Sequence, residues 1–310
     1  MGGMPDRALT AVAPPRTAYR EEPCKTALSP VQGMAFAWSL NPYMGCAHRC
    51  TFCYVRGFEQ RADRPSGEAY GRSVRVKTNV VAVLDTEVRR RSWKHEGVAI
   101  GSATDPYQPA EGQYRLTRGC IQVLGRSRTP FDIITRGPLI VRDIDVLAEA
   151  SARVEVSVNL SVPTLDDHVW RNTEPGTAPP RQRLRAVRIL VDAGIRAGVG
   201  MAPVLPGLSD RPEQLLEVVR AARDAGATHL WTRTLYLQSG TREHFLEGLA
   251  RVWPEEAARY ASLYRGAYLD RSVDQPIRAR VKRLAAEVGI ADRRAQPIEA
   301  PPPERQIALL

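Results

Sequence analysis

Short apolar runs alternate with amphipathic stretches along most of the chain. The runs are rich in β-branched residues and are bounded by Gly, Pro or Asp, which is typical of strands. The pattern predicts six strands, at residues 35–40, 98–103, 131–135, 154–162, 197–204 and 229–236. Because strands that alternate with helices form parallel βαβ units, we expect an α/β fold.

The stretches between these strands carry apolar residues three and four positions apart, which predicts helices with one buried face. Gly194 and Gly226 follow two of them, where glycine commonly ends a helix. The apolar faces lie at residues 80–88, 116–124, 184–191 and 215–219. After the last predicted strand, helices are expected near 243–252, 254–268 and 276–288.

The composition is that of one large α/β domain with appendages. The chain has 310 residues, of which 43% are hydrophobic, enough for a substantial core. No run of about 18 apolar residues is present to span a bilayer. Residues 1–20 carry prolines and charges where a secretory signal needs an apolar core. We therefore expect a cytoplasmic protein without a membrane partner.

Positive charge is in excess but diffuse. The net charge is +10, which is typical of proteins that bind phosphate-rich partners such as nucleic acid. However, only four of the 44 basic residues are lysines, and genomic base composition can produce such a skew without any function. The densest run, Arg89 to Arg91, falls on a predicted helix and favours a solvated face. Nucleic acid is therefore one candidate partner among others.

Three of the five cysteines lie close together. Cys46, Cys50 and Cys53 form a C-x3-C-x2-C loop, whereas Cys24 and Cys120 stand alone. A cubane [4Fe-4S] cluster normally takes four thiolates. Three close-set cysteines can therefore hold three irons and leave the fourth iron open to a small molecule. An open iron predicts chemistry at the metal.

A zinc site is the alternative interpretation of this loop. Structural zinc is tetrahedral with Cys and His ligands, and His48 or a distant residue could supply the fourth ligand. The usual zinc pattern pairs two halves, and no second half is present in the sequence. Our second hypothesis is accordingly a zinc-stabilised protein that binds nucleic acid without radical chemistry.

Polar residues collect at the ends of the predicted strands, where parallel α/β barrels carry their functional groups. The cysteine loop follows the first strand, Thr104 the second and Arg136 the third. Arg136 could bind a carboxylate in bidentate fashion, or it could be an ordinary surface arginine. Ser157 and Asn159 point to the same face of the fourth strand. They either face a ligand or form a hydrogen-bonded pair in the core.

The cysteine loop resembles the signature of the radical S-adenosylmethionine (SAM) superfamily, C-x3-C-x-aromatic-C, with Phe52 at the aromatic position. The resemblance implies a partial (β/α)6 barrel of the TIM type in which Cys46, Cys50 and Cys53 hold a [4Fe-4S] cluster. It implies that the open iron chelates SAM and that the reduced cluster donates one electron to the sulfonium. The 5'-deoxyadenosyl radical released then abstracts a hydrogen atom from the substrate. An external one-electron donor such as flavodoxin or ferredoxin would supply the electron.

Between about residues 41 and 207 the chain also resembles one branch of this superfamily, the spore photoproduct lyase-like proteins. The matching segments are Tyr54 after the cysteine loop, Thr104-Asp105, Thr135-Arg136, Ser157-Val-Asn159, Glu174-x2-Thr177-x5-Arg183-Leu184 and Ala202-Pro203. Carried over by position, Thr104, Arg136 and Ser157 contact the methionyl or ribosyl part of SAM. Phe52 contacts its adenine, and Ala202 approaches through its backbone.

Two further roles follow from the branch resemblance, and one departure limits it. Asn159 is a predicted cofactor contact, and Tyr54 matches a tyrosine implicated in hydrogen return, which makes it the candidate catalytic residue. The photoproduct lyases place a hydrogen-donating cysteine two residues before Thr104, where this chain has Ser102. Because an O–H bond is far stronger than an S–H bond, Ser102 cannot take that role. We therefore expect the thymine-dimer reaction to be absent. We also expect the chain to belong to a subgroup that lacks the donor cysteine.

The predicted organisation has four parts. Residues 1–34, rich in proline and charge, are expected to form an extended or disordered arm, and residues 291–310 a flexible tail. The radical SAM core spans residues 35–240. Residues 241–290 form a helical extension that packs on the open side of the barrel or covers its mouth.

The substrate is not defined by any motif. Nucleic acid, peptides and small molecules all remain candidates. Glu111, Tyr114 and Glu174 are candidate contacts to the substrate or to the residues around it, with an exposed surface position as the alternative.

Overall fold

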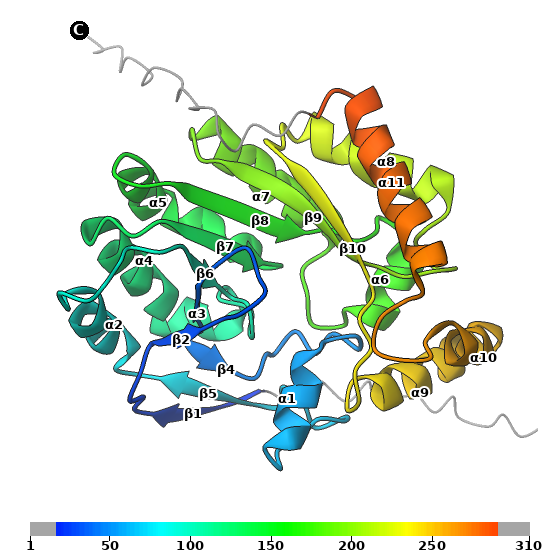
Figure 1. The fold of residues 1–310 in the computed structure, drawn as a ribbon, viewed down its shortest axis with the longest axis horizontal. Helices are drawn as coiled ribbons and strands as arrows, with labels where there is room; N and C mark the ends of the chain where they lie inside the picture. Colours follow the sequence, from blue (N-terminus) through cyan, green and yellow to red (C-terminus); the bar gives the residue numbers. More distant parts are fainter. Residues whose placement is uncertain (1–16, 291–310) are drawn as a thin grey trace, which may run out of the picture.

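The computed structural model describes residues 17–290, and its centre is a seven-stranded sheet (Figure 1). The strand order is β10-β9-β8-β7-β6-β3-β2, with β3 to β10 parallel to their neighbours and β2 antiparallel. The strands are β2 (Leu28–Pro30), β3 (Trp38–Leu40), β6 (Val98–Ile100), β7 (Phe131–Thr135), β8 (Val156–Ser161), β9 (Ala197–Val204) and β10 (Leu230–Thr234). The predicted α/β class and the six parallel strands are confirmed. Since β10 and β2 are the two ends of this order, the sheet is an open, partial barrel.

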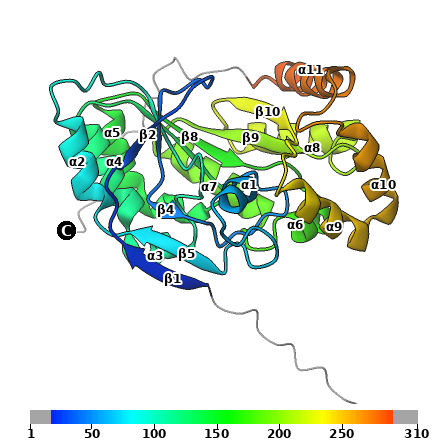
Figure 2. The same cartoon turned by 60° about the horizontal axis from the view of Figure 1, so that its bottom comes forward.

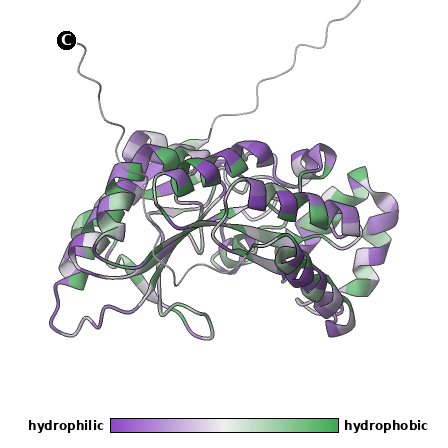
Figure 3. Ribbon diagram, turned by 90° about the horizontal axis from the view of Figure 1, so that it is seen from above, coloured by the Kyte–Doolittle hydropathy of each residue, from purple (hydrophilic) through white to green (hydrophobic). Residues whose placement is uncertain are grey.

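Amphipathic helices cover the outside of the sheet. They are α2 (Val80–Val88), α4 (Leu116–Arg126), α5 (Ile144–Ser151), α7 (Pro180–Asp192) and α8 (Pro212–Asp224). Figure 3 shows hydrophilic and hydrophobic residues alternating along the helices, as expected of helices with one buried face. The predicted apolar faces are confirmed; on α7, for example, Val187 and Leu190 are fully buried.

A second, three-stranded sheet lies beside the β2 end of the main sheet (Figure 2). Its order is β1 (Ala18–Glu22), β5 (Ser73–Lys77) and β4 (Tyr43–Met44). β1 and β2 thus give regular structure to part of the predicted arm, which the polar composition of β1 did not indicate. Residues 1–16 of the arm and the predicted tail at 291–310 lie outside the described residues, and the domain boundaries stay predictions.

The helical extension after β10 is present as predicted. It comprises α9 (Arg242–Val252), α10 (Pro254–Leu263) and α11 (Arg271–Glu287). α11 packs on β10 and α8, while α9 packs on α10. Within residues 17–290, no helix combines the length and the apolar character needed to cross a bilayer.

Four shorter helices complete the part that positions the site. They are α1 (Val55–Arg61), α3 (Pro109–Tyr114), the 3-10 helix η1 (Pro138–Asp143) and α6 (Asp167–Thr173). Asp166 caps α6 by accepting hydrogen bonds from the backbone of His168 and Val169.

Candidate active site

The three-cysteine loop runs from β4 to α1, beyond the carboxyl end of β3. Cys46 and Cys50 are buried, Cys53 is partly buried, and all three thiols are free. Burial raises the pKa of Cys46, and it raises the pKa of Cys50 to about 12 although nearby Arg136 opposes the shift. A cation is therefore needed to stabilise these groups as thiolates, and metal binding releases their protons.

The donor set of this loop fits an iron-sulfur cluster. Sulfur donors on one loop are the usual ligands of such clusters, and each thiolate binds a different iron. Within the described residues, no three His, Cys, Asp or Glu side chains are grouped so as to hold a single metal ion. A cubane does not require three side chains around one ion, because each thiolate binds a different iron.

The backbone of the loop packs tightly on the segment after α6. The amide of Gly176 donates to the carbonyl of His48 at 3.0 Å, and the amide of Thr51 donates to the carbonyl of Thr173 at 2.9 Å. A Cβ on Gly176 would lie 2.5 Å from the carbonyl oxygen of Ala47 and 2.7 Å from that of His48. Only glycine fits at this contact, because both neighbours are backbone atoms.

Gly176→Ala is expected to displace the cysteine loop. The clash with two carbonyl groups should destabilise the protein by about 1–3 kcal/mol and lower the iron content after anaerobic reconstitution. Gly112→Ala on α3 is the control, because its nearest neighbour would be a Leu139 methyl group at 3.9 Å. Thermal unfolding and iron analysis measure both effects; wild-type iron content in Gly176→Ala would refute this packing argument.

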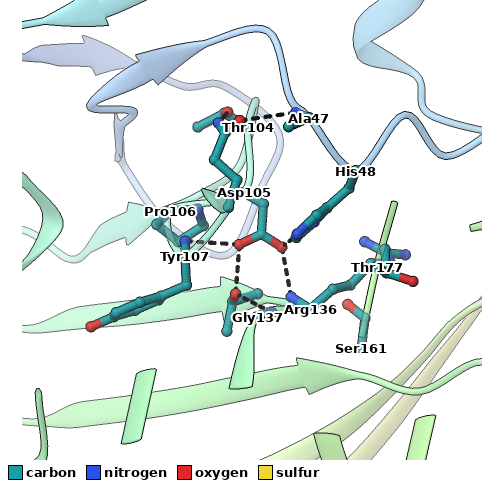
Figure 4. A network of polar contacts seen from close by, with 12 residues as sticks. Ala47, His48, Thr104, Asp105, Pro106, Tyr107, Arg136, Gly137, Ser161 and Thr177 are labelled. Carbon is teal, nitrogen blue, oxygen red and sulfur yellow. Dashed lines mark hydrogen bonds and ion pairs between the residues drawn. The ribbon is translucent and has the colours of Figure 1, made fainter. Parts of the chain in front are cut away.

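Asp105, which follows β6, links the cysteine loop to the end of β7 (Figure 4). Its Oδ1 accepts hydrogen bonds from the amide of Tyr107 at 2.9 Å and the hydroxyl of Thr135 at 2.6 Å. Its Oδ2 accepts from the amide of Arg136 at 2.6 Å and lies 3.2 Å from Nδ1 of His48. Burial opposes ionisation, but the interactions with His48, Thr135 and Arg136 outweigh it and hold the pKa of Asp105 at about 2. One carboxylate thus ties together the two segments that carry the cysteines and Arg136.

Asp105→Asn is expected to remove a pH-dependent part of the stability. The folded pKa of about 2 lies below the ordinary value of 3.8, so the carboxylate stabilises the fold above pH 4 and loses this effect as the pH falls towards 2. The variant should lose about 2 kcal/mol of unfolding free energy at pH 6. Denaturant titrations at several pH values should show this difference shrinking between pH 4 and pH 2. A difference that is constant with pH would argue against an ionised Asp105.

Arg136 is held in a fixed orientation by three partners. Its Nε donates to Glu174 at 2.5 Å, and its Nη2 donates to the carbonyl of Ala202 at 2.9 Å. Its guanidinium lies 5.5 Å from the centre of the Phe52 ring. The structure therefore brings Phe52, Arg136 and Ala202 together beside the cysteine loop. Residues that contact the same cofactor must lie close together in this way. Their roles toward SAM stay predictions.

Glu174 lies between two arginines. It is fully buried and also contacts Nη1 of Arg183, itself buried, at 3.0 Å. Burial raises the pKa of Glu174, but Arg183 and Arg136 more than offset this and lower it overall. Glu174 thus orients Arg136 and is not an exposed surface residue.

The Thr104 hydroxyl faces the cysteine loop. It donates to the carbonyl of Gly45 at 2.7 Å and accepts from Nε2 of Gln108 at 2.9 Å. The side chain of Gln108 also accepts from the amide of Ala47 at 2.9 Å. Thr104 and Gln108 therefore support the loop on both sides of Cys46, and the predicted contact of Thr104 with SAM stays a prediction.

Strand register separates Ser157 from Arg136. Leu160 pairs with Thr135, so Ser161 is level with Arg136, whereas Ser157 pairs with Asp132 nearer the amino ends of the strands. The four residues from Ser157 to Ser161 span about 13 Å along the strand. Figure 4 shows Ser161 near Arg136. The register that sets Ser161 level with Arg136 is not visible in a single sequence.

Ser157 and Asn159 differ in their surroundings. The Ser157 hydroxyl is buried and makes no hydrogen bond within the described residues. Asn159 Oδ1 accepts from Nε2 of His229 at 2.9 Å and from Nε1 of Trp231 at 2.7 Å, so the expected pair with Ser157 does not form. The predicted cofactor contacts of Ser157 and Asn159 stay predictions, and the register places both deeper in the barrel than Arg136.

Tyr54 begins α1 directly after Cys53. Its hydroxyl donates to the carbonyl of Ser102, while its ring remains 39% exposed. Desolvation raises the pKa of Tyr54 to about 12, so the phenol is protonated at neutral pH. Tyr54 therefore stands between the cluster loop and the end of β6, and its catalytic role stays a prediction.

Glu111 and Tyr114 lie away from this site. Glu111 is fully buried and accepts from Nη2 of Arg142 and the amide of Thr117, each at 2.9 Å. The Tyr114 hydroxyl donates to Glu21 at 3.0 Å. Glu111 is therefore a structural carboxylate and not the exposed or substrate-facing residue that the sequence indicated.

The fold and the site together define an open α/β barrel enzyme with a three-cysteine loop at the carboxyl end of its first parallel strand. Residues 40–219 match the family model of the Radical SAM superfamily, and the chain belongs to this superfamily. The protein is therefore a radical SAM enzyme whose cofactors are a [4Fe-4S] cluster and SAM. This membership decides against the zinc-stabilised alternative.

The chain is similar to several known proteins. The chain is 41% identical over 297 residues to "Uncharacterized protein Rv2578c" of Mycobacterium tuberculosis, covering 94% of this chain and 86% of that protein. It is 29% identical over 224 residues to "Uncharacterized protein ORF301" of Acidianus two-tailed virus, covering 68% and 71%. Spore photoproduct lyase complexed with dinucleoside spore photoproduct superposes with a TM-score of 0.66 at 13% identity, covering 87% of this chain and 79% of that chain. The last likeness is one of fold.

Proposed function

We propose that Cys46, Cys50 and Cys53 hold the [4Fe-4S] cluster and that the enzyme cleaves SAM reductively to start hydrogen abstraction from its substrate. The observation that carries this proposal is the placement of three free thiols beside an oriented arginine, Arg136. With both cofactors bound, the cluster would supply the electron that cleaves the sulfonium, and the radical released from SAM would abstract a hydrogen atom. An external donor such as flavodoxin or ferredoxin supplies the electron.

The protein's part is to bind and orient. Arg136 presents its guanidinium to an anionic group, which suits the carboxylate of SAM. Glu174 and the carbonyl of Ala202 fix the orientation of that guanidinium. Phe52, the predicted adenine contact, is 6% exposed and lies beside the Arg136 guanidinium, where it excludes water from the loop.

Anaerobic reconstitution tests this proposal. The protein should take up about four irons and release 5'-deoxyadenosine when reduced in the presence of SAM. A colourless protein with one tightly bound zinc ion would contradict the proposal.

For the substrate we propose a nucleic acid, supported by four aromatic residues at the edge of the site, the aromatic rim: Tyr54, Phe58, Tyr236 and Tyr268. The ring centres of Tyr54 and Phe58 lie 5.6 Å apart, edge to face, and those of Tyr236 and Tyr268 lie 4.8 Å apart. Gln238 links the pairs, because it donates to the carbonyl of Tyr54 at 2.7 Å and accepts from Tyr236 at 3.4 Å. Tyr268 is 77% exposed, and exposed rings of this kind stack on unpaired bases.

Positive charge supports the same substrate class. The Arg61 guanidinium lies 5.0 Å from the centre of the Phe58 ring, and the whole chain has a net charge of +10. Cationic groups among exposed rings bind both the phosphates and the bases of single strands. The structural neighbour was determined with a dinucleoside photoproduct, which is consistent with this proposal.

Tyr268→Ala is expected to weaken binding of single-stranded oligonucleotides about tenfold, because one stacked base contributes about 1–3 kcal/mol. Fluorescence anisotropy at two salt concentrations measures the affinity and its salt dependence. Ile189→Ala on α7 is the control, since Ile189 is also exposed but lies outside the aromatic rim. Equal affinities for the two variants would contradict the nucleic-acid proposal and leave SAM cleavage unaffected.

A further inference from the structure

Tyr70, in the segment between α1 and β5, contacts one of the three cysteines. Its ring is 2% exposed and packs with Cys46 and Val55 in a small apolar cluster. Its hydroxyl oxygen lies 3.5 Å from Sγ of Cys53. A thiolate bound to iron has no proton to give, so the phenol is the donor and the sulfur the acceptor.

Arg56 on α1 lies directly against Tyr70. Its guanidinium is 4.6 Å from the centre of the Tyr70 ring, and the side chain is almost fully buried. Its four hydrogen bonds, of 2.7 to 3.1 Å, go to the carbonyls of Arg49, Cys50, Ser66 and Gly67. Because these partners are carbonyls, they do not neutralise the guanidinium, which places a positive charge under the cysteine loop.

Reduction adds one negative charge to a cluster that already carries negatively charged thiolates. A hydrogen bond to a cluster sulfur and a nearby cation both stabilise the reduced form more than the oxidised form. Both effects are strong where water is excluded, because the effective dielectric constant is low. Tyr70 supplies the hydrogen bond and Arg56 supplies the cation, both beside the same loop.

We propose that Tyr70 and Arg56 form a tuning pair that raises the reduction potential of the cluster. The inference rests on the proposed binding of the cluster by Cys46, Cys50 and Cys53. The redox step concerned is the transfer of one electron from an external donor into the cluster, with no bond broken and no proton moved. Tyr70 and Arg56 make this step easier for a weakly reducing donor.

Tyr70→Phe tests the proposal, because it removes the hydroxyl and keeps the ring that Arg56 covers. The reconstituted protein is poised with dithionite and redox mediators, and the EPR signal of the reduced cluster is recorded against potential. The equilibrium constant for reduction should fall about tenfold, which corresponds to about 59 mV for a one-electron couple. Tyr264→Phe is the matched control, since this buried tyrosine donates to the carbonyl of Leu235 at 3.0 Å, away from the loop.

A second variant fixes the sign of the effect. Replacement of Tyr70 by 3-fluorotyrosine preserves the shape but makes the phenol a stronger donor, so the midpoint should move upward. An unchanged midpoint in Tyr70→Phe overturns the inference while leaving SAM cleavage intact. If Tyr70→Phe fails to hold a cluster, an unchanged midpoint in the fluorotyrosine protein overturns it. A wild-type protein without a four-iron cluster would overturn both the proposed function and this inference.

Discussion

Cys50→Ala is expected to abolish both iron binding and the release of 5'-deoxyadenosine. The cluster would lose one of three protein ligands, and two thiolates of the same loop leave two irons open instead of one. Iron analysis after reconstitution and chromatography of the reduced reaction mixture measure the two effects. Cys46→Ala and Cys53→Ala should behave in the same way.

Cys120→Ala on α4 is the matched control for this prediction. Cys120 is also buried and free, but it lies on α4, outside the three-cysteine loop. Its loss should cost about 1 kcal/mol of stability and leave the iron content unchanged. Iron content and activity that survive in Cys50→Ala would contradict the assignment of the cluster to this loop.

Among the substitutions considered, Glu174→Gln is expected to cause the largest loss of unfolding free energy. Glu174 is the carboxylate between Arg136 and Arg183, and removing its charge leaves the fully buried Arg183 and the 19% exposed Arg136 without this anion. Breaking a buried ion pair costs about 3–5 kcal/mol. Because Glu174 also orients Arg136, the affinity for SAM should fall together with the stability. Denaturant unfolding and equilibrium dialysis with labelled SAM measure the two effects.

Glu217→Gln provides the comparison for Glu174→Gln. Glu217 pairs with Arg181 at 3.5 Å on the surface, where both side chains are more than half exposed. An exposed pair of this kind contributes about 0–1 kcal/mol. Similar losses of stability in the two variants would contradict the view that Glu174 is the anion of a buried network.

The sequence pattern predicted the six parallel strands of the main sheet because they alternate with amphipathic helices. The predicted ranges 131–135 and 197–204 coincide with β7 and β9. β1, β2, β4 and β5 were not predicted. β1 consists of AYREE and β4 of two residues, so their pairing with β5 decides their structure more than their own composition does.

The site was predictable where its signal is local and not where it depends on register or packing. The spacing of the cysteines and the aromatic Phe52 lie within one loop, and Arg136 follows a recognisable strand. The bond of Asp105 to Thr135 joins residues 30 positions apart, and the contact of Tyr70 with Cys53 spans 17 positions. Such contacts form only when the chain folds, and no local pattern in a single sequence indicates them.

Electron-nuclear double resonance of the reduced protein tests the central claim most directly. The protein is reconstituted anaerobically, reduced, and frozen with SAM labelled with nitrogen-15 in its amino group and oxygen-17 in its carboxylate. If Cys46, Cys50 and Cys53 hold a cluster with one open iron, both labels should couple to the cluster spin in the wild-type protein. The coupling should be lost in Cys50→Ala and kept in Cys120→Ala. A wild-type cluster that shows no coupling to either label would contradict the account.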